Sequence, residues 1–265
     1  MADSLLNDTE PGPFELRRAG PGSRLLIHCD HGGNAIPQRL WGLGLRRDAI
    51  DRHIGWDIGA AAVSRYLAHR LSAAGVIARY SRLVIDVNRA LGDPDNIATT
   101  SDGIPIPANV GLSAEDKAAR VADLFWPYHQ AIDWELGLIR EAGHLPVVLS
   151  IHSFTPALMT RTRVKPRPWH CGVMFSRDRR FGDHLIAALR AVPGMIVGEN
   201  EPYSGITHGY CAKLHGLAQG LPHAQIEIRQ DLICTEAGQI WWADYLAQIM
   251  PVILAQADMN DVRHY

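Results

Sequence analysis

The chain has 265 residues, and its 26 Lys and Arg against 28 Asp and Glu give a net charge of −2. This balance provides no basic surplus for non-specific binding to nucleic acid or to an anionic membrane. An apolar content of 47% with 20% charged residues is that of an ordinary globular protein, and no apolar run approaches the roughly 18 residues that cross a membrane.

The N-terminal part of the chain predicts strands, a helix and a long loop. Residues 1–22 contain Pro-Gly pairs, so we expect an irregular lead-in there. Apolar residues at helical spacing over 57–71 predict a helix. The stretch 91–112 is rich in Gly, Pro, Asn and Asp, and we expect a long loop with a functional role. Three short apolar runs predict buried strands: 24–28, 76–80 and 82–87.

The C-terminal part predicts further alternation of strands and helices. Ser113 is a typical N-cap, and its helix is expected to run to about residue 142 with a kink at Pro127. Two more helices are predicted over 181–191 and 235–255. Strands are predicted over 146–151, 171–175, 195–199 and 225–229. This order favours one α/β domain over 23–265, with a mixed, mostly parallel sheet covered by helices on both faces.

Polar residues follow several of these strands at the point where each one ends. Ligands of open α/β sheets bind outside the carboxyl ends of the strands. Two histidines there, with Asp57 at the start of a helix, have the composition of a His₂-carboxylate zinc site that keeps one open position. The residues at the strand ends are His31, Asn88 with Arg89, His152, and Glu227 with Arg229.

Each of these residues also has a purely structural interpretation. His31 precedes two glycines and is typical of a turn, and Asp57 is placed to act as the N-cap of its helix. Glu227 lies between two isoleucines, so strand alternation leaves it either paired with Arg229 on the same face or available as a general base. Arg89 could cap its strand or pair with a nearby aspartate. The pattern alone leaves these alternatives open.

Five segments taken together resemble the N-formylglutamate amidohydrolase (formylglutamate deformylase-like) family, which is part of the zinc carboxypeptidase-like superfamily. The resemblance runs from about Leu25 to Ile233, and the segment that ends in Asn88-Arg89 is its most specific piece. The segments are Asp30-His-Gly-Gly-Asn-Ala-Ile-Pro37, Trp56-Asp-Ile-Gly-Ala60, Ser81-Arg-Leu-Val-Ile-Asp-Val-Asn-Arg89, Ser150-Ile-His-Ser-Phe154 and Ile226-Glu-Ile-Arg-Gln-Asp-Leu-Ile233.

The resemblance implies a site with one zinc ion per chain, held by His31, Asp57 and His152. The carboxypeptidase pattern has a Glu three residues after the first His. This chain has Asn34 there, which carries no carboxylate, so Asp57 is the expected third ligand. Glu227 matches the late Glu that serves as general base.

The resemblance also implies how a substrate is bound. Asn88 and Arg89 match a pair that holds a substrate carboxylate, and Arg82 and Arg229 are further candidates for binding an anion. The loops 91–112 and 199–210 are candidates to cover the pocket, and the second loop offers Glu201, Tyr203 and His208 to its lining.

The expected activity is zinc-dependent hydrolysis of the formyl or acyl C–N bond of a small N-acyl amino acid such as N-formyl-L-glutamate. The alternatives are a zinc hydrolase of another N-acyl amino acid, a peptide or a peptidoglycan fragment, and a metal-free protein that binds a small anion. The acidic N-terminus lacks the features of a secretion signal, so we expect a cytoplasmic protein. Without a Gly-x-Ser-x-Gly elbow, a serine hydrolase is disfavoured.

Overall fold

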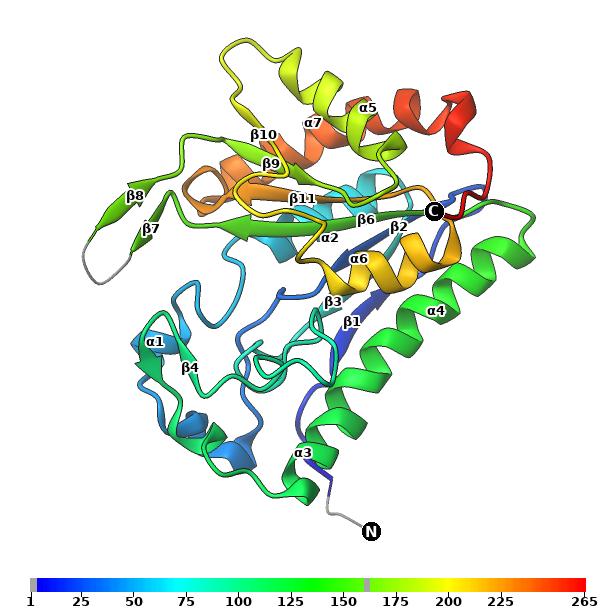
Figure 1. The fold of residues 1–265 in the computed structure, drawn as a ribbon. Coiled ribbons are helices and arrows are strands. Elements are labelled where there is room, and N and C mark those ends of the chain that lie inside the picture. The colour runs from blue at the N-terminus through cyan, green and yellow to red at the C-terminus, as the bar shows by residue number, and fades with distance from the viewer. Residues whose placement is uncertain (1–3, 160–162) are drawn as a thin grey trace.

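A computed structural model describes residues 4–159 and 163–265. Within these residues, seven strands form one sheet in the order β1–β3–β2–β6–β11–β9–β10 (Figure 1). The pairs β1–β3 and β11–β9 are antiparallel and the other neighbours are parallel, which confirms the predicted mixed, mostly parallel sheet. The strands are β1 (Phe14–Arg17), β2 (Leu25–Cys29), β3 (Ala74–Ala78), β6 (Val147–Phe154), β9 (Cys171–Met174), β10 (Val197–Glu199) and β11 (His223–Arg229).

Helices cover both faces of this sheet, as predicted. On one face, α2 (Ala60–Arg70), α5 (Arg180–Arg190) and α7 (Glu236–Leu254) pack against the strands. On the other face lie α4 (Trp126–Glu141) and α6 (Tyr210–His215) (Figure 1). Each face has its own apolar core, so the central strands are buried on both sides, and the polar residues of β6 and β11 are buried together with the apolar ones.

The long helix predicted from Ser113 forms in three parts. The Ser113 hydroxyl accepts a hydrogen bond from the backbone N–H of Asp116 at 3.0 Å, which confirms the N-cap of α3 (Ala114–Arg120). A π-helical turn over Val121–Phe125 then leads into α4. Pro127 lies in the first turn of α4 and has no N–H to donate to the preceding turn, which explains the wider hydrogen-bonding pattern at this point.

The strand predicted over 82–87 is wrong, because this segment is a series of turns. Its apolar residues are buried in the core beneath α4, and that burial produces the same pattern as a buried strand. Side chains from elsewhere satisfy its backbone: Asn109 donates to the carbonyl of Leu83 at 2.8 Å, and Arg120 donates to that of Val84 at 2.7 Å. The segment therefore needs no neighbouring strand.

Several short elements escaped prediction. The lead-in, expected to be irregular, contributes β1 to the sheet. The predicted loop 91–112 holds only the small pair β4 (Thr100–Ser101) and β5 (Ile104–Pro105) and one 3-10 turn. The remaining elements are α1 (Arg47–Ile50), the projecting pair β7 (Ala157–Met159) and β8 (Val164–Pro166), and 3-10 turns at Gln38–Gly44, Pro107–Asn109, Leu217–Gln219, Gln230–Leu232 and Ala257–Met259. Among the described residues, no helix has the length and apolar character to cross a membrane.

Candidate active site

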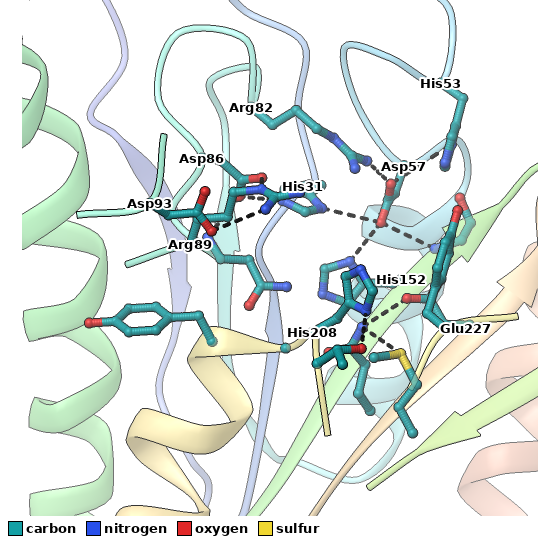
Figure 2. Close-up of a pocket in the computed structure, with 18 of the residues that line it drawn as sticks. His31, His53, Asp57, Arg82, Asp86, Arg89, Asp93, His152, His208 and Glu227 are labelled. Atoms are coloured by element: carbon teal, nitrogen blue, oxygen red, sulfur yellow. Dashed lines mark hydrogen bonds and ion pairs between the residues drawn. The ribbon is translucent and has the colours of Figure 1, made fainter. Parts of the chain in front are cut away.

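A cavity of about 440 Å³ opens at the carboxyl ends of β2, β6 and β11. His31 follows β2, while His152 and Glu227 lie directly opposite each other in the parallel register of β6 and β11. Figure 2 shows these side chains turned toward one another in the cavity. Neighbouring strands of a parallel sheet thus bring together three of the predicted site residues, which are far apart in the sequence.

Three buried side chains converge at the centre of this cavity. The Asp57 Oδ2 atom lies 2.7 Å from His152 Nδ1 and 3.6 Å from His31 Nδ1. One ligand atom from each of the three residues lies within 4.8 Å of the others. His31 Nδ1 is buried without a hydrogen-bond partner, which is costly unless another group binds it. Two imidazoles and one carboxylate around an unpaired nitrogen fit a zinc ion.

On the side of each imidazole ring that faces away from Asp57, another carboxylate binds the Nε2 atom. His31 Nε2 donates to Asp86 Oδ1 at 2.7 Å, and His152 Nε2 donates to Asp30 Oδ2 at 3.0 Å. An imidazole that donates one N–H to a carboxylate keeps its other nitrogen directed at a metal. Asp30 and Asp86 therefore orient both histidines with Nδ1 toward Asp57.

The charges of these groups follow from burial and from their partners. Burial, together with the nearby Arg82 charge, lowers the pKa of His31 to about 4, so the ring is neutral at pH 7. Burial would raise the pKa of Asp86, but His31 and Arg82 hold it at about 2. Burial likewise opposes a charge on His152, yet its hydrogen bond to Asp30 raises its pKa. A metal ion would thus replace a proton on His152 Nδ1.

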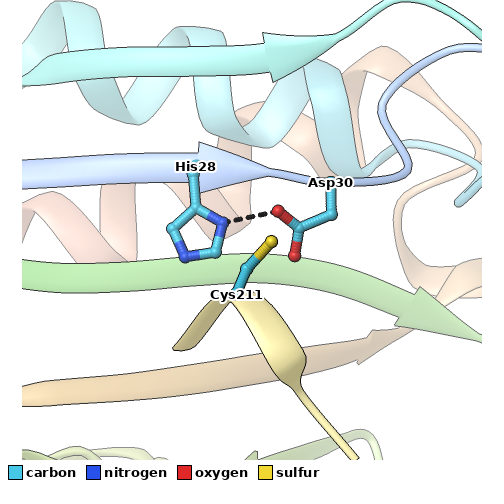
Figure 3. A group of neighbouring side chains, drawn as sticks. All are labelled: His28, Asp30 and Cys211. Carbon is cyan, nitrogen blue, oxygen red and sulfur yellow. Dashed lines mark hydrogen bonds and ion pairs between the residues drawn. The ribbon is translucent and has the colours of Figure 1, made fainter. Parts of the chain in front are cut away.

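Asp30 also belongs to a second cluster, which lies behind His152. Its Oδ1 atom accepts from His28 Nδ1 and from the Tyr128 hydroxyl, each at 2.8 Å. Figure 3 shows Cys211 beside His28 and Asp30. These three residues are close enough to hold a metal ion. Because both oxygens of Asp30 are already hydrogen-bonded, we interpret the cluster as support for His152.

Asp57 stands at a turn whose backbone is shaped by glycine. Gly59 has φ +82°, and a Cβ atom there would lie 2.1 Å from the carbonyl oxygen of Ile233. α2 begins after Gly59, which is its N-cap, so Asp57 is not the cap of that helix. The Asp57 Oδ1 atom pairs with Arg82 and lies 3.8 Å from His53 Nδ1.

Glu227 is buried at the bottom of the cavity. Its Oε1 atom accepts from Gln225 Nε2 at 2.8 Å, while its Oε2 atom is buried without a partner. Burial raises the pKa of this carboxyl. Arg229 does not pair with Glu227: its guanidinium binds Asp231 at 2.8 and 3.2 Å, and it is not part of the cavity lining formed by the described residues.

Arg89 lines the cavity close to several carboxylates. Its guanidinium lies 3.4 Å from Asp86, 3.2 Å from Asp93 and 4.0 Å from Asp95. Asn88 and Arg82 also line the cavity. Of the site residues named from the sequence, Arg229 and Glu201 do not belong to the cavity lining formed by the described residues, and Glu201 is exposed; the others face one space.

Sequence reasoning missed several residues of this wall, among them His53 and Lys213. The sequence signal that could have identified His53 as a site residue is its position four residues before Asp57. Tyr203 and His208, expected in the covering loop, do line the cavity. The Tyr203 hydroxyl accepts from Arg167 Nη2 at 3.0 Å, and Arg167 itself is buried.

Comparisons with known proteins agree with this fold. Among solved structures, the gene product Atu2144 from Agrobacterium tumefaciens is 33% identical, with a TM-score of 0.87 over 95% of this chain and 98% of its own. An N-formylglutamate amidohydrolase from Ralstonia eutropha JMP134 shares the fold, with a TM-score of 0.66 at 19% identity over 92% of this chain and 97% of that one. A search of curated proteins finds no match.

The sequence profile of one family matches residues 23–234, a range that contains every residue of the site described above. This range runs from the start of the first parallel strand to the turn after β11. The chain therefore belongs to the N-formylglutamate amidohydrolase family and is an amidohydrolase.

Proposed function

We propose that this amidohydrolase depends on one zinc ion held by His31, Asp57 and His152. The observation that carries the proposal is the buried His31 Nδ1 atom, which has no hydrogen-bond partner and faces Asp57 beside His152. The substrate that family membership favours is an N-acyl amino acid such as N-formyl-L-glutamate. The reaction breaks the C–N bond between the acyl group and the amino acid.

Zinc in such a site supplies a Lewis acid, which lowers the pKa of water toward about 7 and polarises a carbonyl group. The residues of the chain perform the proton transfers. Glu227 Oε2 is unpaired and lies across from His152, so it is placed to accept a proton from the attacking water. The same carboxyl then donates that proton to the leaving nitrogen, and its raised pKa favours this second step.

The arginines have separate roles in this proposal. Arg82 holds the Oδ1 atom of Asp57 and leaves Oδ2 for the metal, and it places a cation beside the reacting carbonyl. Arg89 and Asn88 bind a carboxylate of the substrate, because a guanidinium presents paired donors to a carboxylate. Arg229, which binds Asp231 and is not one of the described residues that line the cavity, has no role in this proposal.

The test combines metal content with turnover. We expect about one zinc per chain by elemental analysis, lost in His31→Ala and kept in the matched control His69→Ala, whose histidine is exposed on α2. Glu227→Gln should keep its zinc and lose about 10²–10⁴-fold in kcat. Hydrolysis is measured on a panel of N-formyl and N-acetyl amino acids.

Two results would contradict the proposal. A wild-type protein that binds no zinc when zinc is supplied at neutral pH would make the site an anion-binding pocket. A fully active Glu227→Gln variant would remove Glu227 from the proton transfer. Preferential hydrolysis of peptides or peptidoglycan fragments would keep the metal site but change the substrate class.

A further inference from the structure

The cavity contains a cation that the proposed reaction does not use. Lys213 of α6 lines the cavity, and its Nζ atom donates to the carbonyl of Ile206 at 2.9 Å. Among the described residues, no carboxylate lies within ion-pair distance of this ammonium group. A lysine has three N–H donors, so two remain for a ligand. Partial burial lowers the pKa of Lys213.

Unlike Lys213, the arginines proposed for anion binding are paired with carboxylates of the chain itself. Arg82 is paired with Asp57, and Arg89 has three aspartates within 4.0 Å. A cation that is already neutralised attracts a further carboxylate less strongly than an unpaired one does. Lys213 is therefore the wall residue whose charge is most available to an incoming anion.

The helix that carries Lys213 is fixed beside the Asn88–Arg89 turn. The Asn88 Oδ1 atom accepts from the backbone N–H of Cys211 at 2.9 Å, and the Cys211 thiol donates to the carbonyl of Val87 at 3.2 Å. Lys213 lies two residues further along α6 and faces the same cavity. Hydrogen bonds thus connect the Asn88–Arg89 turn directly to the helix that carries Lys213.

A substrate with an acidic side chain has two carboxylates, and Asn88 with Arg89 accounts for one of them. We propose that Lys213 binds the second carboxylate and makes the enzyme prefer acidic over neutral N-acyl amino acids. This inference rests on the proposed function, because it assigns a substrate preference to the same site.

The test compares two substrates that differ only in this charge, N-formyl-L-glutamate and N-formyl-L-glutamine. We expect Lys213→Met to raise the KM for the glutamate substrate about 10–100-fold, the range for one charge-assisted hydrogen bond, and to leave kcat and the glutamine substrate nearly unchanged. Lys213→Arg should restore part of the preference. Lys117→Met, which removes an exposed lysine on α3, is the matched control.

A binding measurement separates this inference from the proposed function. Calorimetric titration of the zinc-loaded protein with L-glutamate and L-glutamine requires no turnover. Tighter binding of glutamate by the wild type, weakened at least tenfold in Lys213→Met, supports the inference even if hydrolysis is absent. The inference is overturned if the wild type shows no preference for glutamate, or if Lys213→Met keeps that preference while its thermal unfolding matches the wild type.

Discussion

At the scale of single residues, the candidate site depends on which nitrogen of each imidazole faces inward. Asp86 and Asp30 hold the Nε2 atoms of His31 and His152, so both histidines present Nδ1 to Asp57. A ring turned over about its Cβ–Cγ bond would direct a C–H group at the position that Nδ1 now faces and could not bind a metal there. In the proposed metal site, the two aspartates thereby determine the geometry of the ligands without contacting the ion themselves.

In the proposed zinc site, Asp30 is a positioning residue. We expect Asp30→Asn to weaken zinc binding about 10–100-fold, because the amide loses the charge that orients and strengthens His152 as a ligand. Zinc affinity is measured by competition with a chromophoric chelator. Asp102→Asn, which removes a carboxylate from the cavity wall away from both histidines, is the control. An unchanged dissociation constant in Asp30→Asn would show that packing alone positions His152.

At the scale of elements, burial and position in the sheet decide what can be predicted from sequence. Strands β2, β6 and β11 are buried on both faces, and the apolar residues of β2, of the first half of β6 and around Glu227 in β11 predicted their limits to within a few residues. The segment 82–87 is equally buried but runs in turns, and only distant side chains such as Asn109 and Arg120 reveal this. Local sequence does not contain that information.

The same limit applies to the site. His31, His152 and Glu227 were predictable because they stand at the carboxyl ends of strands, where open α/β sheets bind their ligands. Lys213 was not predictable, because α6 is one and a half turns long and lies between two glycines. The helix is stabilised by tertiary contacts, among them the 2.8 Å hydrogen bond between His215 Nε2 and His129 Nδ1.

This contact predicts that α6 is sensitive to the loss of one imidazole. His215 is fully buried and also binds Asp133 at 2.9 Å. We expect His215→Ala to reduce the free energy of unfolding by about 2–4 kcal/mol, through the cavity and the unpaired His129. Urea unfolding measures this change against the exposed-site control His69→Ala. Equal unfolding midpoints for the two variants would mean that α6 does not depend on this hydrogen bond.

At the scale of the whole molecule, two apolar cores enclose a set of buried histidines. Burial lowers the pKa of His31 and of His129 to about 4. Burial also lowers the pKa of His53 and His223, whereas Asp30 raises that of His152 against the effect of burial. Most of these rings are therefore neutral in the folded chain and become charged when the chain unfolds below pH 6.5.

The consequence is a pH-dependent stability of the metal-free protein. Between pH 6.5 and about 4 the unfolded chain binds more protons than the folded chain, so the free energy of unfolding falls as the pH falls. His31 and His129 each contribute on the order of 3 kcal/mol, and His152 offsets a part because its pKa is raised. Urea unfolding in the presence of a chelator, from pH 7 to pH 4, measures the slope. A free energy of unfolding that does not change over this pH range would contradict the conclusion that the buried histidines are neutral in the folded chain.

The separation of the proposed ligands along the chain has one more consequence. His31, Asp57 and His152 come together only when β2, α2 and β6 have assembled, so the unfolded chain offers no comparable site. A metal that binds only the native state adds about 2.7 kcal/mol to its stability at a concentration one hundred times its dissociation constant. Supply of the ion would then govern how long the polypeptide survives proteolysis in a cell, as well as how fast it turns over substrate.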